Sequence, residues 1–401
     1  MIPPMEDKSS KSCHYPGSKY RIAIVTSIHR DFDSRIWKYA NSLVKMGHEV
    51  TLICPWEIPD GEVLDKILFR TFTRASARSE RWKLPTRLLG RLIPVLTEND
   101  IVHFHDLDIL PWMTFLALFK PVVYDIHENY PLEILERQWI HPILRRPLSF
   151  GVRWAQLACA QLIRNLVLVA ESQERDLFGP RLRKHYVMNY ASTELRKHVK
   201  DDYGSRLPSV IFTGSQLPNN GCFLYLKIAS IVHKRRNDVV FYATDRFDRG
   251  DATRIRLDQE IHSLGLRESY KLLPHVSPQS IMDNLNLATI AISPNLRVAQ
   301  QINGVHTKLF EYMAAGLPIV ASDLPHQLKV VGVNNAGLLA RPEEPESFAE
   351  AILTLLDDRE LARSMGANGV RAFLDQYSWE SQESSISDYY ESILGQPGRN
   401  K

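Results

Sequence analysis

The chain has 401 residues, of which 44% are hydrophobic and 24% charged, proportions that exclude a disordered or fibrous protein and predict two or three globular domains. The 49 basic residues nearly balance 46 acidic ones, so a net charge of +3 gives no indication of nucleic-acid binding. The first twenty residues are polar, unlike a secretory signal, and four scattered cysteines without CxxC spacing predict a reducing, cytoplasmic location.

Short apolar runs alternate with helical patterns along the first half of the chain. A helix is expected in DSRIWKYANSLVKMG, directly after the first of these runs. Runs that are apolar almost throughout are typical of parallel strands covered by helices on both faces. The expected strands are 21–26, 49–54, 101–105, 121–127, 165–170 and 185–189.

The same alternation restarts after the polar segment 190–208, which has no clear period and is the candidate linker. Strands are expected over 209–214, 238–244, 270–274, 288–293 and 317–322, with helices over 223–234 and 308–315. The pattern predicts an α/β protein with two Rossmann-like, doubly wound domains facing a central cleft, where ligands bind at the carboxyl ends of strands. The expected divisions are a tail (1–19), an N-terminal domain (20–200), a C-terminal domain (201–377) and a segment whose helix packs back on the N-terminal domain (378–401).

The strongest local signal is HTKLFEYMAAGLPIVASDLP at 306–325, which predicts a helix followed by a buried strand. The start of a helix attracts phosphate through its free N–H groups, and Lys308 adds a positive charge there. Glu311 lies three residues on, where a carboxylate can accept hydrogen bonds from ribose hydroxyls. The alternative is a surface ion pair between the two side chains.

This segment, followed by AGLLARPEEPESFAEAILTLLDD, resembles the C-terminal half of the family-4 retaining glycosyltransferases of the GT-B fold. DSRIWKYANSLVKMGHEVTLI, IVHFHDLDILP and VVYDIHENYP resemble loops of the capsule and cell-surface polysaccharide branch of that family. The likeness runs from about Arg21 to Leu394 in the same order across both halves.

The resemblance implies a donor site in the C-terminal domain. Glu311 matches the second glutamate of the family's E-x7-E motif, whereas Asn303 stands at the first. The family's basic pair is replaced by Ser215 and Asn220, so Lys308, with Arg297 nearby, is the substitute phosphate clamp. The predicted donor-binding residues are Gly214, Ser215, Asn220, Arg297, Asn303, Gly304, Thr307 and Glu311.

The resemblance also places catalytic and acceptor groups. His127 matches the histidine that faces the reacting sugar and is predicted to be catalytic together with Lys308, with Asp125 and Glu128 as the neighbours that orient it. The alternative is a core histidine bonded to a backbone carbonyl. Glu128 is also assigned to the acceptor side.

Asp33 and Arg35 follow the first strand on a loop that resembles the DxR variant of the polysaccharide branch, and they are assigned to the acceptor side. The alternative is a helix N-cap at Asp33 or Ser34 with Arg35 on the surface. His105 ends a strand and is predicted to reach the cleft.

The run HFHDLD invites a metal-site interpretation, since it combines an HxH pattern with a DxD pattern. Both signals are short, and we expect no metal and no cofactor beyond the nucleotide sugar. No G-x-G-x-x-G, P-loop or G-x-S-x-G motif is present.

The sequence therefore predicts a metal-independent glycosyltransferase that moves a sugar from a nucleotide-diphosphate donor to a saccharide or lipid-linked acceptor, with retention, in cell-surface glycan synthesis. Two alternatives stay open: a catalytically weak or inactive GT-B homologue that serves as a binding or partner subunit, and a sugar-nucleotide 2-epimerase. The basic segment Arg70 to Arg91 predicts peripheral contact with the inner face of the plasma membrane or, alternatively, the solvated face of an ordinary helix.

Overall fold

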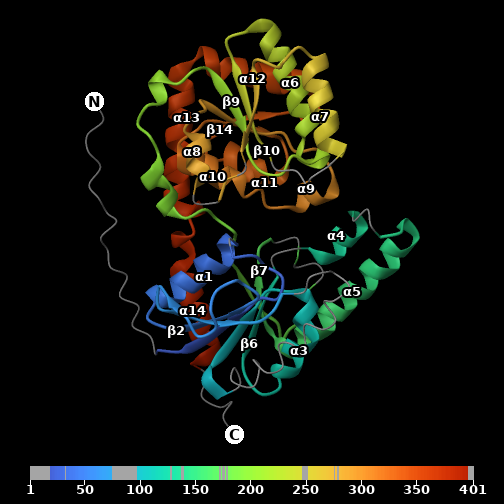
Figure 1. Ribbon diagram of the computed structural model, residues 1–401, viewed down its shortest axis with the longest axis vertical. Helices are drawn as coiled ribbons and strands as arrows, with labels where there is room; N and C mark the ends of the chain where they lie inside the picture. The colour runs from blue at the N-terminus through green and yellow to red at the C-terminus, as the bar shows by residue number, and fades with distance from the viewer. Residues whose placement is uncertain are drawn as a thin grey trace.

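The computed structural model describes residues 19–31, 33–74, 97–126, 129–136, 140–170, 173, 177, 179–245, 252–274, 276–277 and 280–395. These residues form two α/β domains, one above the other in Figure 1, each built on a mostly parallel sheet covered by helices. The predicted two-domain α/β architecture is confirmed.

The N-terminal domain has an eight-stranded sheet in the order β3-β4-β2-β1-β5-β6-β7-β8, and only the β3–β4 pair is antiparallel. Its strands are β1 (Arg21–Val25), β2 (Glu49–Cys54), β3 (Val63–Leu64), β4 (Ile67–Thr71), β5 (Ile101–Phe104), β6 (Val122–Ile126), β7 (Asn165–Leu168) and β8 (Arg183–Tyr186). Its described helices are α1 (Ser34–Lys45), α3 (Leu110–Leu116), α4 (Tyr130–Glu136) and α5 (Pro142–Ile163). The expected strands are present, while β3 and β4 were not anticipated.

The C-terminal domain has a six-stranded, fully parallel sheet in the order β11-β10-β9-β12-β13-β14. Its strands are β9 (Ser209–Phe212), β10 (Val240–Asp245), β11 (Tyr270–Pro274), β12 (Ile290–Ser293), β13 (Ile319–Ser322) and β14 (Gly337–Ala340). Its helices are α6 (Cys222–Arg235), α7 (Ala252–Ser263), α8 (Ile281–Leu285), α9 (Ala299–Asn303), α10 (Lys308–Ala315), α11 (Pro325–Gln327), α12 (Pro345–Asp357) and α13 (Arg359–Ala372).

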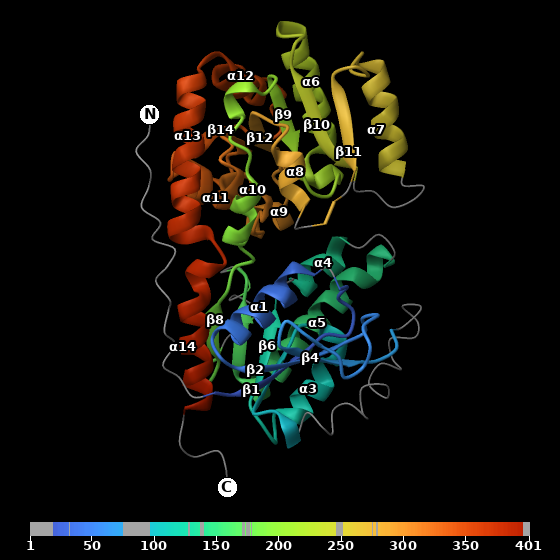
Figure 2. The same cartoon turned by 60° about the vertical axis from the view of Figure 1, so that its left-hand side comes forward.

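The last helix, α14 (Glu383–Leu394), returns to the N-terminal domain and lies along its sheet (Figure 2). Buried Trp379 precedes it and donates a hydrogen bond from Nε1 to the Ser42 hydroxyl at 2.8 Å. The Tyr390 hydroxyl lies 2.5 Å from Nδ1 of His103 at the centre of the sheet. The chain therefore crosses between the domains twice, and the second crossing is anchored in the N-terminal core.

Candidate functional site

A cavity of about 370 Å³ lies between the two domains. The N-terminal wall comes from segments that follow β1, β6, β7 and β8, and the other wall comes from α9 and the loop before α10. Parallel strands bring such segments together at one edge of a sheet. The lining residues are His29, Asp33, Asn129, Leu132, Glu133, Val169, Ala170, Gln173, Asn189, Gln300, Asn303, Gly304, Val305 and Thr307.

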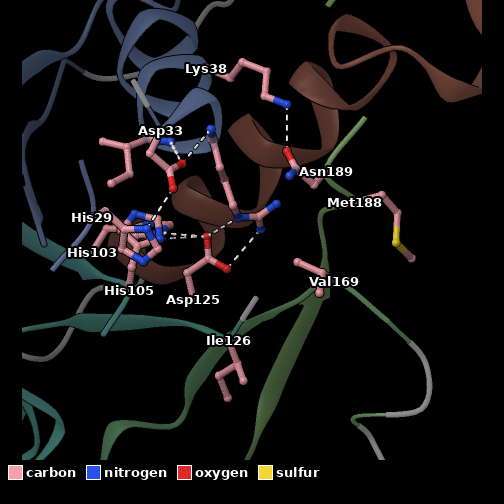
Figure 3. A network of polar contacts seen from close by, with 12 residues as sticks. His29, Asp33, Lys38, His103, His105, Asp125, Ile126, Val169, Met188 and Asn189 are labelled. Carbon is pink, nitrogen blue, oxygen red and sulfur yellow. Dashed lines mark hydrogen bonds and ion pairs between the residues drawn. The ribbon is translucent and has the colours of Figure 1, made fainter. Parts of the chain in front are cut away.

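The N-terminal wall holds a histidine between two carboxylates, and Figure 3 shows this histidine, His29, beside one of them, Asp33. Nδ1 of His29 lies 2.7 Å from Asp33, and Nε2 lies 3.1 Å from Asp106. Burial lowers the pKa of His29, but the hydrogen bonds to Asp106 and Asp33 more than offset this and raise it to about 10. Burial raises the pKa of Asp106, but the contact with His29 and the hydrogen bonds donated by Thr26 and Ser27 lower it to about 2. The wall therefore carries an imidazolium at neutral pH.

A second ion pair lies beneath this wall. Nε and Nη2 of Arg35 each donate to a different oxygen of Asp125 at 2.9 Å, and both side chains are buried. Burial raises the pKa of Asp125, but the Arg35 charge holds it well below its usual range. His103 and His105 lie 3.4 and 3.3 Å from the same carboxylate. Asp125, predicted as a neighbour that orients His127, is thus engaged with the first turn of α1.

His103, His105 and Asp125 are close enough to ligate one metal ion. Their chemistry does not suit one, because a bidentate Arg35 already balances the only carboxylate of the group. A divalent cation placed there would meet a buried guanidinium at short range, which low dielectric makes costly. We therefore assign the cluster a structural role beneath the cavity.

A lysine joins α1 to the segment that leads to the C-terminal domain. Nζ of Lys38 donates to Oδ1 of Asn189, a cavity residue, at 2.7 Å and to the carbonyl of Tyr190 at 2.6 Å (Figure 3). Burial lowers the pKa of Lys38 to about 7, and the neighbouring Arg35 charge acts in the same direction. Glu311 of the opposite domain is among the carboxylates that oppose this shift.

On the C-terminal side, Lys308 is the first residue of α10 and follows the cavity residue Thr307. Its Nζ is buried, lies 4.3 Å from the centre of the Phe212 ring, and has no hydrogen-bond partner among the residues that the structure describes. Burial lowers the pKa of Lys308 to about 7, and Glu311 partly offsets the shift. A buried amine without a partner is costly, and an anionic ligand would satisfy it.

The loop after β9 lies beside this amine. Gly214 has a φ of 93°, and a Cβ at this position would contact Cε of Lys308 at 3.9 Å. Ser215 and Asn220, predicted to replace the basic pair, are bonded to each other, because the Asn220 amide donates to the Ser215 carbonyl at 2.9 Å. Oδ1 of Asn220 accepts from Gln301, so the amide is held in the loop rather than projecting from it.

The remaining predicted residues fall into four groups. Asn303, Gly304 and Thr307 line the cavity, as does Asp33, which also caps α1 by accepting from the Arg35 and Ile36 amides. Arg35 and His105 are a correction: they are buried beneath the wall, because Asp125 draws both inward. Arg297 is exposed, and its backbone N–H donates to Glu343. His127 and Glu128 lie outside the described residues.

Sequence reasoning missed three functional candidates: His29, Asp106 and Lys38. The signal for His29 was its place in the loop after the first strand, close to Asp33. Asp106 was considered only as part of a metal motif, and its contact with His29 spans 77 positions, which no local pattern reveals.

Two family models match the chain, one for each domain. Residues 34–180 match Glycosyltransferase Family 4, and residues 207–358 match Glycosyl transferases group 1. Among curated proteins, an alpha-D-kanosaminyltransferase from Streptomyces kanamyceticus is 24% identical over 298 residues, covering 71% of this chain and 73% of that protein. A D-inositol 3-phosphate glycosyltransferase from Paenarthrobacter aurescens is 21% identical, and the chain matches less than half of its length, 44%.

Solved structures share the fold across nearly the whole chain. Sucrose-phosphate synthase from Thermosynechococcus elongatus superposes with a TM-score of 0.74 at 13% identity, covering 94% of this chain and all of that one. Anabaena HepE in complex with UDP and glucose gives 0.69 at 14% identity, with 93% and 100% covered. Two domains built on mostly parallel sheets around a central cavity, matched in this way, define a glycosyltransferase of the GT-B fold. Both domains are thus similar to glycosyltransferase families, and the N-terminal domain is similar to family 4.

Proposed function

We propose that this glycosyltransferase moves a sugar from a nucleotide-diphosphate donor on the C-terminal domain to a saccharide or lipid-linked acceptor on the N-terminal domain. The observation that carries the proposal is the buried Lys308 amine, which has no partner among the described residues and lies beside Gly214. A diphosphate would supply the missing acceptor atoms and the opposite charge. HepE, whose structures contain UDP and UDP-glucose, supports a nucleotide-sugar donor by likeness of fold.

The proposed chemistry assigns each wall a task. Lys308 neutralises the leaving diphosphate, whose charge grows in the transition state, and Glu311 accepts hydrogen bonds from the ribose hydroxyls. Asn303 in the cavity wall bonds a hydroxyl of the donor sugar. His29 and Asp33 face the acceptor, whose hydroxyl attacks from the side that the diphosphate leaves, so the anomeric configuration is retained. The cavity between the domains excludes water from the reacting centre.

His127 keeps its proposed place facing the reacting sugar, by family resemblance alone. We place the activity in cell-surface polysaccharide synthesis on the same basis. Ser215 and Asn220 are proposed only as the frame of the donor loop. Arg297, which is exposed, stays a proposed phosphate contact.

One observation favours the second candidate, a GT-B homologue without activity that serves as a partner subunit. Neither Ser215 nor Asn220 carries a charge, and the Asn220 side chain is already bonded within the protein. Lys308 would then be the main described cation near the diphosphate.

The test compares the wild-type enzyme with Lys308→Met and with a control, Lys227→Met, which removes an exposed lysine from α6 of the same domain. UDP and GDP are titrated calorimetrically, and transfer is assayed with a panel of nucleotide sugars. We expect Lys308→Met to lower kcat about 100-fold, the scale of losing one preorganised charge at the leaving group, and Lys227→Met to have no effect. An effect on KM alone would reduce Lys308 to a binding group. No turnover with any donor, together with no nucleotide binding, would favour the partner-subunit function.

We also propose a working position at the inner face of the plasma membrane, where lipid-linked acceptors are anchored. Within the described residues, no helix has both the length and the apolar character needed to cross a bilayer. Most of the basic segment Arg70 to Arg91, on which this expectation first rested, lies outside the described residues.

A further inference from the structure

Helix α5 carries an unusual number of exposed apolar side chains. Its N-terminal half projects beyond the body of the N-terminal domain beside α4 (Figure 1). Ile143 is 77% exposed, Phe150 is 63% exposed, and Trp154 is 46% exposed. Ordinary surface helices present polar groups in such positions, so this face needs a partner.

The exposed residues fall on one side of the helix. At about 100° per residue they span an arc of roughly 160° that contains only one polar side chain, at its far C-terminal end. The opposite side is the one packed on the protein, since the Ser149 hydroxyl donates to the Pro131 carbonyl and Arg145 donates to the Ile140 carbonyl. The exposed large members of the stripe are Ile143, Leu144, Leu148, Phe150, Trp154 and Leu162.

A second helix adds to this surface. Helix α3 packs against α5, and it and the turn after it expose Trp112, Phe115, Leu118 and Phe119. The rings of Phe115 and Phe119 contact each other edge to face at 5.2 Å. Ten of the 21 exposed large apolar side chains found among the described residues thus lie on α3, its following turn and α5, which we call the α3/α5 face.

The two helices of this face carry only positive charges. Neither α3 nor α5 contains an aspartate or glutamate, whereas α5 contains Arg145, Arg146 and Arg153. Lys120 follows α3 and donates to the carbonyl of Asn99, close to where the chain re-enters the described structure after the basic segment. Aromatic and aliphatic side chains with Arg146 and Arg153 along one edge match the interface of an anionic bilayer, because the rings enter the headgroup region while the cations meet lipid phosphates.

The location of the face fits an acceptor that is anchored in lipid. Helix α4 supplies Leu132 and Glu133 to the cavity wall, and α4 packs directly against α5 (Figure 2). We propose that the α3/α5 face docks the protein on an anionic membrane surface and so presents lipid-linked acceptors to the cavity. This inference rests on the proposed working position at the inner face of the plasma membrane, and it assigns the membrane contact to α3 and α5.

The experiment measures binding of the full-length protein to vesicles of phosphatidylcholine, with and without one third phosphatidylglycerol. The variant Phe150→Ser/Trp154→Ser removes two aromatic rings from α5, and Phe115→Ser/Phe119→Ser removes two from α3. The matched control, Val333→Ser/Leu374→Ser, removes two exposed apolar side chains from the C-terminal domain. Thermal unfolding establishes that each variant is folded.

We expect the wild type to bind the anionic vesicles in a salt-sensitive manner, each face variant to bind at least about tenfold more weakly, and the control to bind as the wild type does. Equal binding by wild type and face variants would overturn the proposal. A second result would also overturn it: the wild type does not bind vesicles but forms a dimer in sedimentation velocity, and the face variants abolish that dimer. The face would then pair two copies of the chain. Nucleotide binding and transfer to a water-soluble acceptor are measured separately. If the proposed donor site proves wrong, the vesicle-binding result still tests the membrane proposal.

Discussion

The buried ion pair between Arg35 and Asp125 is expected to make a large contribution to the stability of the N-terminal domain, and substitution of Asp125 tests this. Arg35 is 3% exposed and Asp125 is fully buried, and two hydrogen bonds of 2.9 Å join them. The substitution Asp125→Asn keeps the size of the side chain and removes its charge. The Arg35 guanidinium then stays buried without its direct counter-ion.

Breaking a buried pair in this way costs about 3–5 kcal/mol, because the remaining ion keeps its desolvation penalty. Asp33, near the same guanidinium, compensates only in part, since it caps the helix and bonds His29. Typical domains have stabilities of about 5–15 kcal/mol, so the loss would be a large fraction of the stability of the N-terminal domain.

Urea unfolding followed by tryptophan fluorescence measures the loss for Asp125→Asn. The control is Glu350→Gln, which breaks an exposed pair with Arg235 and is expected to cost less than about 1 kcal/mol. The apolar double variant Arg35→Met/Asp125→Leu removes both charges and is expected to recover part of the stability, because no lone ion is left. If Asp125→Asn costs no more than Glu350→Gln, the pair is not a structural anchor and the reasoning is refuted.

Two further predictions concern titration and backbone geometry. Because folding raises the pKa of His29 from 6.5 to about 10, its stabilising contribution is complete below about pH 6.5 and is lost as the pH rises through 10. The unfolding free energy should therefore fall between pH 7 and 10 more steeply in the wild type than in His29→Gln, and parallel curves would contradict the assignment. Gly221 has a φ of 89°, and a Cβ there would lie 1.9 Å from the Pro294 carbonyl oxygen, so Gly221→Ala should cost at least about 2 kcal/mol in thermal unfolding. Gly265→Ala, at a φ of 69° with open space around it, should cost about half as much; equal losses would show that the contact with Pro294 is relieved.

The local pattern of apolar and polar residues was sufficient to predict most of the strands and helices. Strands such as β1 and β6 are mostly apolar because helices cover both faces of the sheet, and a sequence pattern of this kind can be recognised directly. Strand β4 was missed because Arg70 interrupts its apolar character, and the edge strand β3 was missed because it has only two residues. The segment 190–208 was expected to be a linker without regular structure, but it contains 3₁₀ helices at Thr193–His198 and Tyr203–Ser205.

The candidate site was predictable only in part, for a geometric reason. Lys308 and Thr307 lie next to each other in a local motif, so the sequence indicated them together. His29 and Asp106 meet only because β1 and β5 are neighbours in the sheet, with Val25 paired to Phe104. Such a contact depends on strand order, which periodicity does not determine.

The DxR pattern at the start of α1 shows how one short motif serves both the cavity and the core. Asp33 precedes the helix as its N-cap and lines the cavity, whereas Arg35, in the first turn of the helix, is buried beneath the cavity wall. Arg35 reaches Asp125 there, and the cap made by Asp33 fixes where the helix begins. The two side chains are therefore coupled through the first turn of α1. A loss of activity in an Arg35 variant would then reflect displacement of Asp33 and His29, and it should be accompanied by a loss of stability.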